Sequence, residues 1–170
     1  SSSLQKQKGT YNDLTTNYGL SFDSRDRSFN TRSGSFLTFG QTLPIYADKS
    51  FIGNRFTVSN YNTLNEDIIG VTKFYLSTIT GLGSDDVRLS KRQSLSTKRL
   101  RGFKKNKIGP LDNNDYIGGN YAAALNFEAN LPNVLPENTN TDIGAFLDFG
   151  NVWGVDYDDT IDESNTIRSS

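Results

Sequence analysis

The chain has 170 residues, a formal net charge of −1 and a hydrophobic fraction of 34%. That fraction is low for a soluble globular domain, where about 45–50% is usual. The absence of cysteine and histidine excludes disulfides, thiolate metal sites and histidine-based acid–base chemistry. The nearly balanced charge gives no field that favours nucleic acid. Aromatic residues make up 12% of the chain, which argues against disorder and favours strands with one apolar face.

Polar and apolar residues alternate along several segments, and this period of two predicts strands. In chain order the predicted strands are 17–24, 34–43, 51–64, 67–80, 117–131 and 141–153, with the start of a seventh at 167–169. The connections 25–33, 65–66 and 132–140 are short, 44–50 is intermediate, and 81–116 and 154–164 are long. Short turns at one end and long loops at the other are typical of outer-membrane barrels. We therefore expect an all-β, antiparallel transmembrane β-barrel, present in part as about six to seven strands.

The last two long predicted strands place their polar residues on one face. In 117–131 the even positions include Asn126 and Glu128, and in 141–153 the same parity gives Asp148. Such residues suit a water-filled lumen better than a packed apolar core. Because the two strands are consecutive and antiparallel, diagonal neighbours on this face should lie within about 7–8 Å.

Several short motifs carry a family resemblance, and they are distributed over nearly the whole chain. They are Phe22–Arg27, Ser33-Gly34, Leu100–Phe103, Ile108–Pro110, Ile117–Asn120, Leu125–Glu128, Ala145–Trp153 and Asn165–Ser169. Together they resemble the C-terminal barrel of the BamA-type outer-membrane protein assembly factors, within the bacterial surface antigen superfamily. Members carry periplasmic POTRA domains and a sixteen-stranded barrel. We therefore expect residues 1–170 to be part of one barrel domain, a fragment that lacks the POTRA domains and the final strands.

The resemblance implies that residues 81–116 form a long loop that carries the Arg-Gly-Phe motif and folds back into the lumen. There Arg101 would pair with Glu128 and Asp148 as a structural latch, and the strand parity independently places both acids on the inward face. A guanidinium fork can bridge two such carboxylates. The alternative is a solvated arginine in a basic loop.

The neighbouring residues of the motif have expected supporting roles. Gly102 should let the loop backbone approach the wall, and Phe103 should wedge against it. The supporting glycines of the latch are expected to be Gly118, Gly119 and Gly150.

The resemblance implies a function in the outer membrane of a Gram-negative bacterium, namely the insertion and folding of β-barrel proteins. No covalent chemistry is expected, so we predict no enzyme activity, no catalytic residue, no cofactor and no metal site. Expected partners are unfolded outer-membrane β-barrel clients, accessory assembly lipoproteins, and outer-membrane lipid and lipopolysaccharide, but not nucleic acid. In the family, a weak seam between the first and last strands templates the client by β-augmentation. Neither seam strand is expected in this chain.

Other functions remain open from the sequence alone. A TamA-like or two-partner-secretion transporter would move a polypeptide through the same kind of barrel. A passive porin or a soluble β-sandwich is a further possibility, although a sandwich requires an apolar inner face. Paired acids also occur in glycoside hydrolases, but the expected latch engages both. The acidic cluster at 156–163 lacks the spacing of a calcium-binding EF-hand loop and is expected to be a solvated surface.

Overall fold

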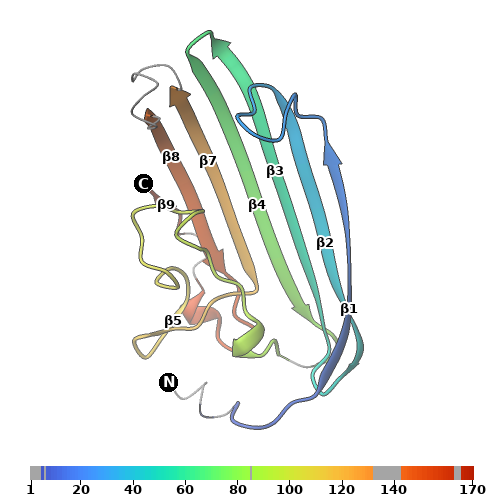
Figure 1. Cartoon of the computed structure of the whole chain (residues 1–170). Helices are drawn as coiled ribbons and strands as arrows, with labels where there is room; N and C mark the ends of the chain where they lie inside the picture. Colours follow the sequence, from blue (N-terminus) through green and yellow to red (C-terminus); the bar gives the residue numbers. More distant parts are fainter. Residues whose placement is uncertain (1–4, 6, 85, 132–142, 163–165) are drawn as a thin grey trace.

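One antiparallel sheet dominates the structure, a computed structural model that describes residues 5, 7–84, 86–131, 143–162 and 166–170 (Figure 1). Its seven strands lie side by side in the order β1 (Asp13–Asp23), β2 (Gly34–Ala47), β3 (Phe51–Asn65), β4 (Ile68–Gly81), β7 (Tyr121–Leu131), β8 (Ile143–Trp153) and β9 (Arg168–Ser169). Within the described residues β1 and β9 are edges, so the sheet is open. The expected all-β antiparallel fold, with about seven strands of a partial barrel, is confirmed.

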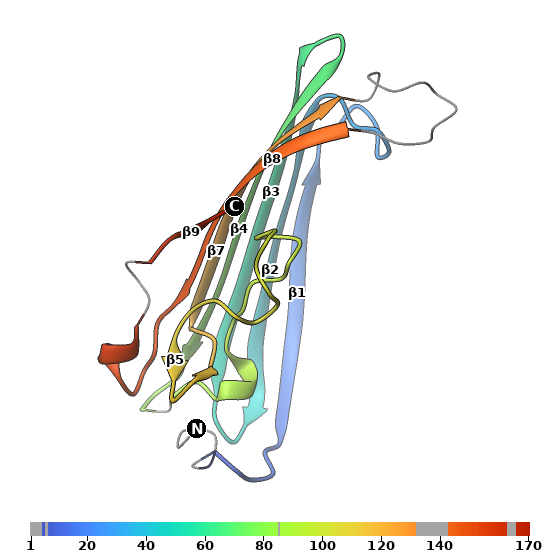
Figure 2. The same cartoon turned by 90° about the vertical axis from the view of Figure 1, so that its left-hand side faces the viewer.

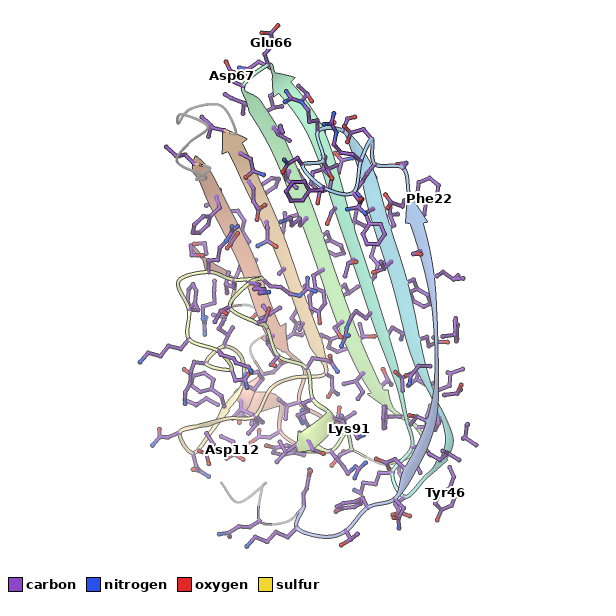
Figure 3. The ribbon with its side chains drawn as sticks, in the orientation of Figure 1. Phe22, Tyr46, Glu66, Asp67, Lys91 and Asp112 are labelled. Carbon is purple, nitrogen blue, oxygen red and sulfur yellow. The ribbon has the colours of Figure 1, made fainter. Side chains whose placement is uncertain are left out.

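The two ends of the sheet differ in the connections that they carry. At one end β3 and β4 are joined by a tight turn, in which the Asn65 side chain accepts a hydrogen bond of 2.9 Å from the backbone N–H of Asp67. The long connection between β4 and β7 leaves from the other end. Figure 3 shows this separation, because Glu66 and Asp67 lie at one end of the molecule and Asp112 lies toward the other. The second end also carries the β2–β3 turn of residues 48–50, so long connections and one short turn occur there together.

The strand register sorts the side chains into two faces, because directly paired residues project on the same side of a sheet. On one face Ser77 pairs with Ala122 and also with Arg55. On the other face the pairing row runs through Val58, Phe74, Leu125 and Phe149. We call the first the inner face and the second the outer face. The apolar outer face is the one that the sequence pattern predicts to contact lipid.

The long connection of residues 82–120, called here the inserted segment, lies against the inner face (Figures 1 and 2). It contains the short 3-10 helix η1 (Leu89–Lys91) and the hairpin formed by β5 (Leu111–Asp112) and β6 (Asp115–Tyr116). The sequence analysis predicted neither element. The hairpin turn has positive φ at both central residues, 48° at Asn113 and 69° at Asn114, and asparagine tolerates this conformation better than most residues.

Strand boundaries differ from the predicted ones at two places. β2 continues to Ala47 instead of ending at residue 43. Pro44 fits there because the β2–β3 pairing already ends at Thr42, so the missing N–H costs no hydrogen bond on that side. β7 begins at Tyr121 and not at 117, because the chain turns sharply at Gly118, where φ is +68°.

The acidic connection after β8 contains a second 3-10 helix, η3 (Asp159–Ile161). Among the described residues no helix is long and apolar enough to cross a membrane. The predicted connection 132–140 and the first two residues of the predicted strand 141–153 lie outside the described residues.

A charge on the outer face should be far more costly than the same charge on the inner face. We expect Leu76→Arg to lower the free energy of unfolding by about 2–4 kcal/mol in lipid vesicles, because the guanidinium would face hydrocarbon. Ser21→Arg is the matched control, because the register places Ser21 on the inner face opposite the uncharged Thr38, and it should change stability little. Denaturant titration of the vesicle-reconstituted full-length protein measures both. Equal losses for the two variants would contradict the assignment of the faces.

Candidate functional site

The inserted segment is fixed to the inner face by an apolar cluster. Leu95, Leu100 and Ile108 from the segment pack on wall residues of β4, β7 and β8, which are Tyr75, Ala122, Ala124 and Val152. Phe103 packs against the edge of this cluster. Leu100 is completely buried, and burying one leucine side chain stabilises by about 1.5–3 kcal/mol. The main apolar core of the described chain therefore lies between a loop and a wall, and it brings residue 101 to the sheet.

Arg101 lies directly over β8 and binds the carboxylate of Asp148 through three nitrogens. Its backbone N–H donates to Oδ2 over 3.0 Å, its Nε donates to Oδ2 over 2.7 Å, and its Nη2 donates to Oδ1 over 2.5 Å. The Asp148 side chain has 0% exposure, whereas that of Arg101 keeps 29%. The two side-chain bonds form the planar fork typical of arginine–carboxylate pairs. The buried negative charge is therefore matched by a cation held in one orientation.

The remaining nitrogen of the guanidinium reaches the second expected acid. Nη1 of Arg101 lies 3.0 Å from Oε1 of Glu128. The register pairs Asn126 with Asp148 and Glu128 with Phe146, so the two acids are diagonal neighbours on the inner face. The guanidinium carbon also lies 3.8 Å from the centre of the Phe146 ring, a cation–π arrangement. The structure thus brings together all three charged residues expected from the sequence, and their role as a latch remains a prediction.

Two further wall residues join this group, and the sequence analysis did not assign them to the site. Nζ of Lys73 lies 2.7 Å from Oε2 of Glu128. Nδ2 of Asn126 donates 2.8 Å hydrogen bonds to Oδ1 of Asp148 and to the backbone oxygen of Arg99. Parity had placed Asn126 on the same face as the two acids, and the pairing register adds Lys73 to that face and shows that both residues flank the acids. We call Lys73, Arg101, Asn126, Glu128 and Asp148 the charged cluster.

The electrostatic effect on the loop cation follows from this geometry. The hydrogen bond with Asp148 raises the pKa of Arg101, and Glu128 adds to the effect. Arg101 therefore remains charged over the whole physiological range.

Position 102 requires glycine for a different reason from the one expected. Its φ is +82°, in the region that favours glycine, but a Cβ there would come no closer than 3.4 Å to Ser170. The position needs glycine for backbone conformation and not for a close approach to the wall. This turn directs Phe103 back toward the apolar cluster.

The three expected supporting glycines lie where the inserted segment touches the wall. A Cβ at Gly119 would fall 2.2 Å from the backbone oxygen of Trp153, and one at Gly150 would fall 2.9 Å from Leu95. Gly118 combines its positive φ with a contact of 2.6 Å from a hypothetical Cβ to the backbone oxygen of residue 93. Each position therefore leaves no room for a larger side chain.

A second set of contacts, which the sequence analysis missed, holds the base of the inserted segment. Asp156 accepts a hydrogen bond of 2.8 Å from the backbone N–H of Val87 and another from the side chain of Asn120. Nη2 of Arg92 lies 3.8 Å from the same carboxylate. Burial lowers the pKa of Arg92, and the Asp156 charge opposes this effect. Asp156 thus ties together both ends of the segment, whereas its sequence context had suggested a solvated acidic surface.

The base is also bound to the first strand of the sheet. Arg88 forms an ion pair with Asp13 at the start of β1, and only 8% and 12% of these side chains are exposed. Nζ of Lys91 lies 3.3 Å from the same carboxylate. A local sequence pattern does not predict this contact, because Arg88 and Asp13 are separated by 75 positions in the chain. Within the described residues no group of three or more potential metal ligands occurs.

Comparison with known proteins agrees with the open sheet and its loop. Residues 1–170 match the Omp85 superfamily domain. The chain belongs to the Omp85 superfamily. This Omp85 chain is 25% identical over 173 residues to the outer membrane protein assembly factor BamA of Neorickettsia risticii, with 99% of the chain and 23% of the relative covered. It is 28% identical over 134 residues to the human sorting and assembly machinery component 50 homolog, with 76% and 29% covered.

A solved structure shows the same fold. The chain resembles a crystal structure of BamA from Haemophilus ducreyi lacking POTRA domains 1–3, with a TM-score of 0.81 at 19% sequence identity. The match covers 92% of this chain and 35% of that structure. The expected relationship to BamA-type proteins is confirmed, and the chain spans about a quarter of the length of the curated relatives.

Removing one partner of the Arg101–Asp148 pair should destabilise the docked segment more than removing both charges. We expect Arg101→Ala to destabilise the docked segment by about 2 kcal/mol, because Asp148 would remain buried and charged. The double variant Arg101→Ala/Asp148→Asn should lose less than Arg101→Ala alone, because no buried charge is then left without its partner. Hydrogen exchange of the backbone amides in 93–108 reports the opening free energy. Additive losses would contradict a coupled pair.

The base contact should act independently of the charged cluster. We expect Asp156→Ala to accelerate hydrogen exchange about tenfold in 86–95, because one charge-assisted hydrogen bond to the backbone is lost. Peptides covering 98–104 should change little, since their contacts to β7 and β8 remain. Asp158→Ala is the control, because that carboxylate bonds within its own turn to Thr160. Equal acceleration in both variants would refute the assignment.

Proposed function

We propose that this chain is the wall and lumen-loop region of a protein that inserts and folds β-barrel proteins in an outer membrane. The observation that carries the proposal is the charged cluster, in which Arg101 of an inserted segment bridges Glu128 and Asp148 on the inner wall. Membership of the Omp85 superfamily and the names of the matched relatives, an assembly factor and an assembly machinery component, support it.

The bacterial outer membrane of a Gram-negative cell is the proposed location. The clients would be unfolded outer-membrane β-barrel proteins, with accessory lipoproteins, lipid and lipopolysaccharide as further partners, and nucleic acid plays no part. No covalent step is proposed, so the protein is not an enzyme. The barrel itself would promote insertion, because its conformation would set the activation barrier for folding of the client in the membrane.

In this proposal the cluster acts as a latch that keeps the loop on the wall. The apolar contacts of Leu100 and its neighbours hold the loop broadly, because dispersion and burial have little directionality. The guanidinium fork fixes the orientation of the loop on the wall, since its two bonds to Asp148 form only in one orientation. A loop fixed in this way would stiffen β7 and β8 and keep the lumen partly filled while the client folds.

Loss of the latch should reduce assembly without abolishing the fold. We expect Arg101→Ala in the full-length protein to slow client barrel folding in lipid vesicles about tenfold, in proportion to the population of docked loop. Arg101→Lys should recover part of the rate, because the charge remains but the fork is lost. Lys104→Ala, an exposed substitution in the same loop, is the matched control. Release of client into solution with unchanged folding rates would instead favour a polypeptide transporter.

A further inference from the structure

The inner face carries a second feature at β1–β3, away from the charged cluster. Three glycines lie together there. Gly19 is directly opposite Gly40, and Gly53 of β3 is opposite Thr42, two residues along β2 from Gly40. They form the floor of a cavity of about 660 Å³, rimmed by Ser21, Thr38, Arg55, Lys91 and Gln93. We call this cavity the glycine trough.

The space above two of these glycines, Gly40 and Gly53, is not occupied by the described chain. A Cβ at Gly40 would meet nothing closer than 3.9 Å, and one at Gly53 nothing closer than 3.6 Å. Neither position has a φ in the region that favours glycine. This differs from Gly119, where a neighbouring backbone fills the space. Glycine within a strand often marks a close approach of another backbone, and no backbone of the described residues makes that approach at Gly40 or Gly53.

The charge of the trough is unbalanced. None of the described residues that line it carries a carboxylate, whereas Arg55 and Lys91 both carry a positive charge. Lys91 already pairs with Asp13, but no ion pair to Arg55 occurs within the described part of the chain. The guanidinium of Arg99 lies 3.4 Å from the centre of the Tyr75 ring. Burial lowers the pKa of Arg99, Tyr75 opposes this effect, and the charge of Arg55 adds a smaller lowering.

We propose that the glycine trough binds an acidic segment of the same protein from outside these 170 residues, with a carboxylate paired to Arg55. Charge complementarity supports an acidic occupant. The glycine floor supports a polypeptide whose backbone comes close to the wall. The matched relatives have far more chain than this region covers, and this protein already fixes its own inserted segment to the inner face through Arg–Asp pairs.

The occupant is a loop of the chain itself rather than a client. A permanent occupant neutralises Arg55 continuously, whereas a transient client would leave it without a carboxylate between cycles. The inference does not depend on the proposed assembly activity, since a transporter barrel would need the same neutralisation.

Photo-crosslinking in the full-length membrane-embedded protein tests this site. p-Benzoylphenylalanine replaces Ser21, which lines the trough, and mass spectrometry identifies the peptide joined to it after irradiation. We expect an intramolecular product with a segment of the same chain that contains Asp or Glu. Arg55→Glu should reduce its yield about tenfold, the loss expected for one charge-assisted hydrogen bond, and Arg55→Lys should retain most of it.

A steric variant gives an independent test. Gly40→Phe fills the trough and should also remove the product, whereas Ser59→Phe, on the same inner face but outside the trough, should leave it unchanged. Heat-modifiable mobility on gels verifies that each variant has folded. Products only with other polypeptides, no product at all, or an intramolecular product insensitive to Arg55→Glu would each overturn the inference.

Discussion

The structure depends on the neutralisation of one buried carboxylate. Asp148 is fully buried on the inner face of the sheet. An ionised carboxylate in that position is costly unless a cation and hydrogen bonds match it. Arg101 and Asn126 provide that match, and Arg101 reaches the site only when the inserted segment is docked. Burial of the acid and docking of the loop are therefore one event.

Around this contact, the inserted segment uses two kinds of attachment. The apolar cluster around Leu100 provides burial without a preferred direction, whereas the ion pairs at the charged cluster and at the base fix the orientation of the segment. The glycines complete the arrangement in opposite ways. Gly119 in the segment and Gly150 on the wall are small because segment and wall meet closely at both positions, whereas Gly40 and Gly53 leave space that the described chain does not occupy. The inner face is thus shaped partly for contacts within this region and partly for contacts beyond it.

Much of the fold follows from local pattern. Alternation fixed the existence and the facing of the long strands, because in a strand successive side chains must point to opposite sides. Their ends were less predictable. β2 passes through Pro44 because its neighbour on one side has already stopped pairing, and β7 starts late because Gly118 breaks the strand. The hairpin at Asn113-Asn114 was missed although asparagine pairs favour such turns, since its strands have only two residues each.

The candidate site, like the fold, was predictable from the sequence only in part. Parity and composition are local properties, and they predicted that Glu128 and Asp148 share the inner face and that Arg101 lies in a long polar connection. The other residues that attach the inserted segment to the sheet follow from three-dimensional packing. Lys73 joins through the β4–β7 register, Asp156 through the meeting of two loops, and Asp13 through a contact across 75 positions. Pairing register and loop docking depend on the packing of the whole sheet, and no local pattern encodes them.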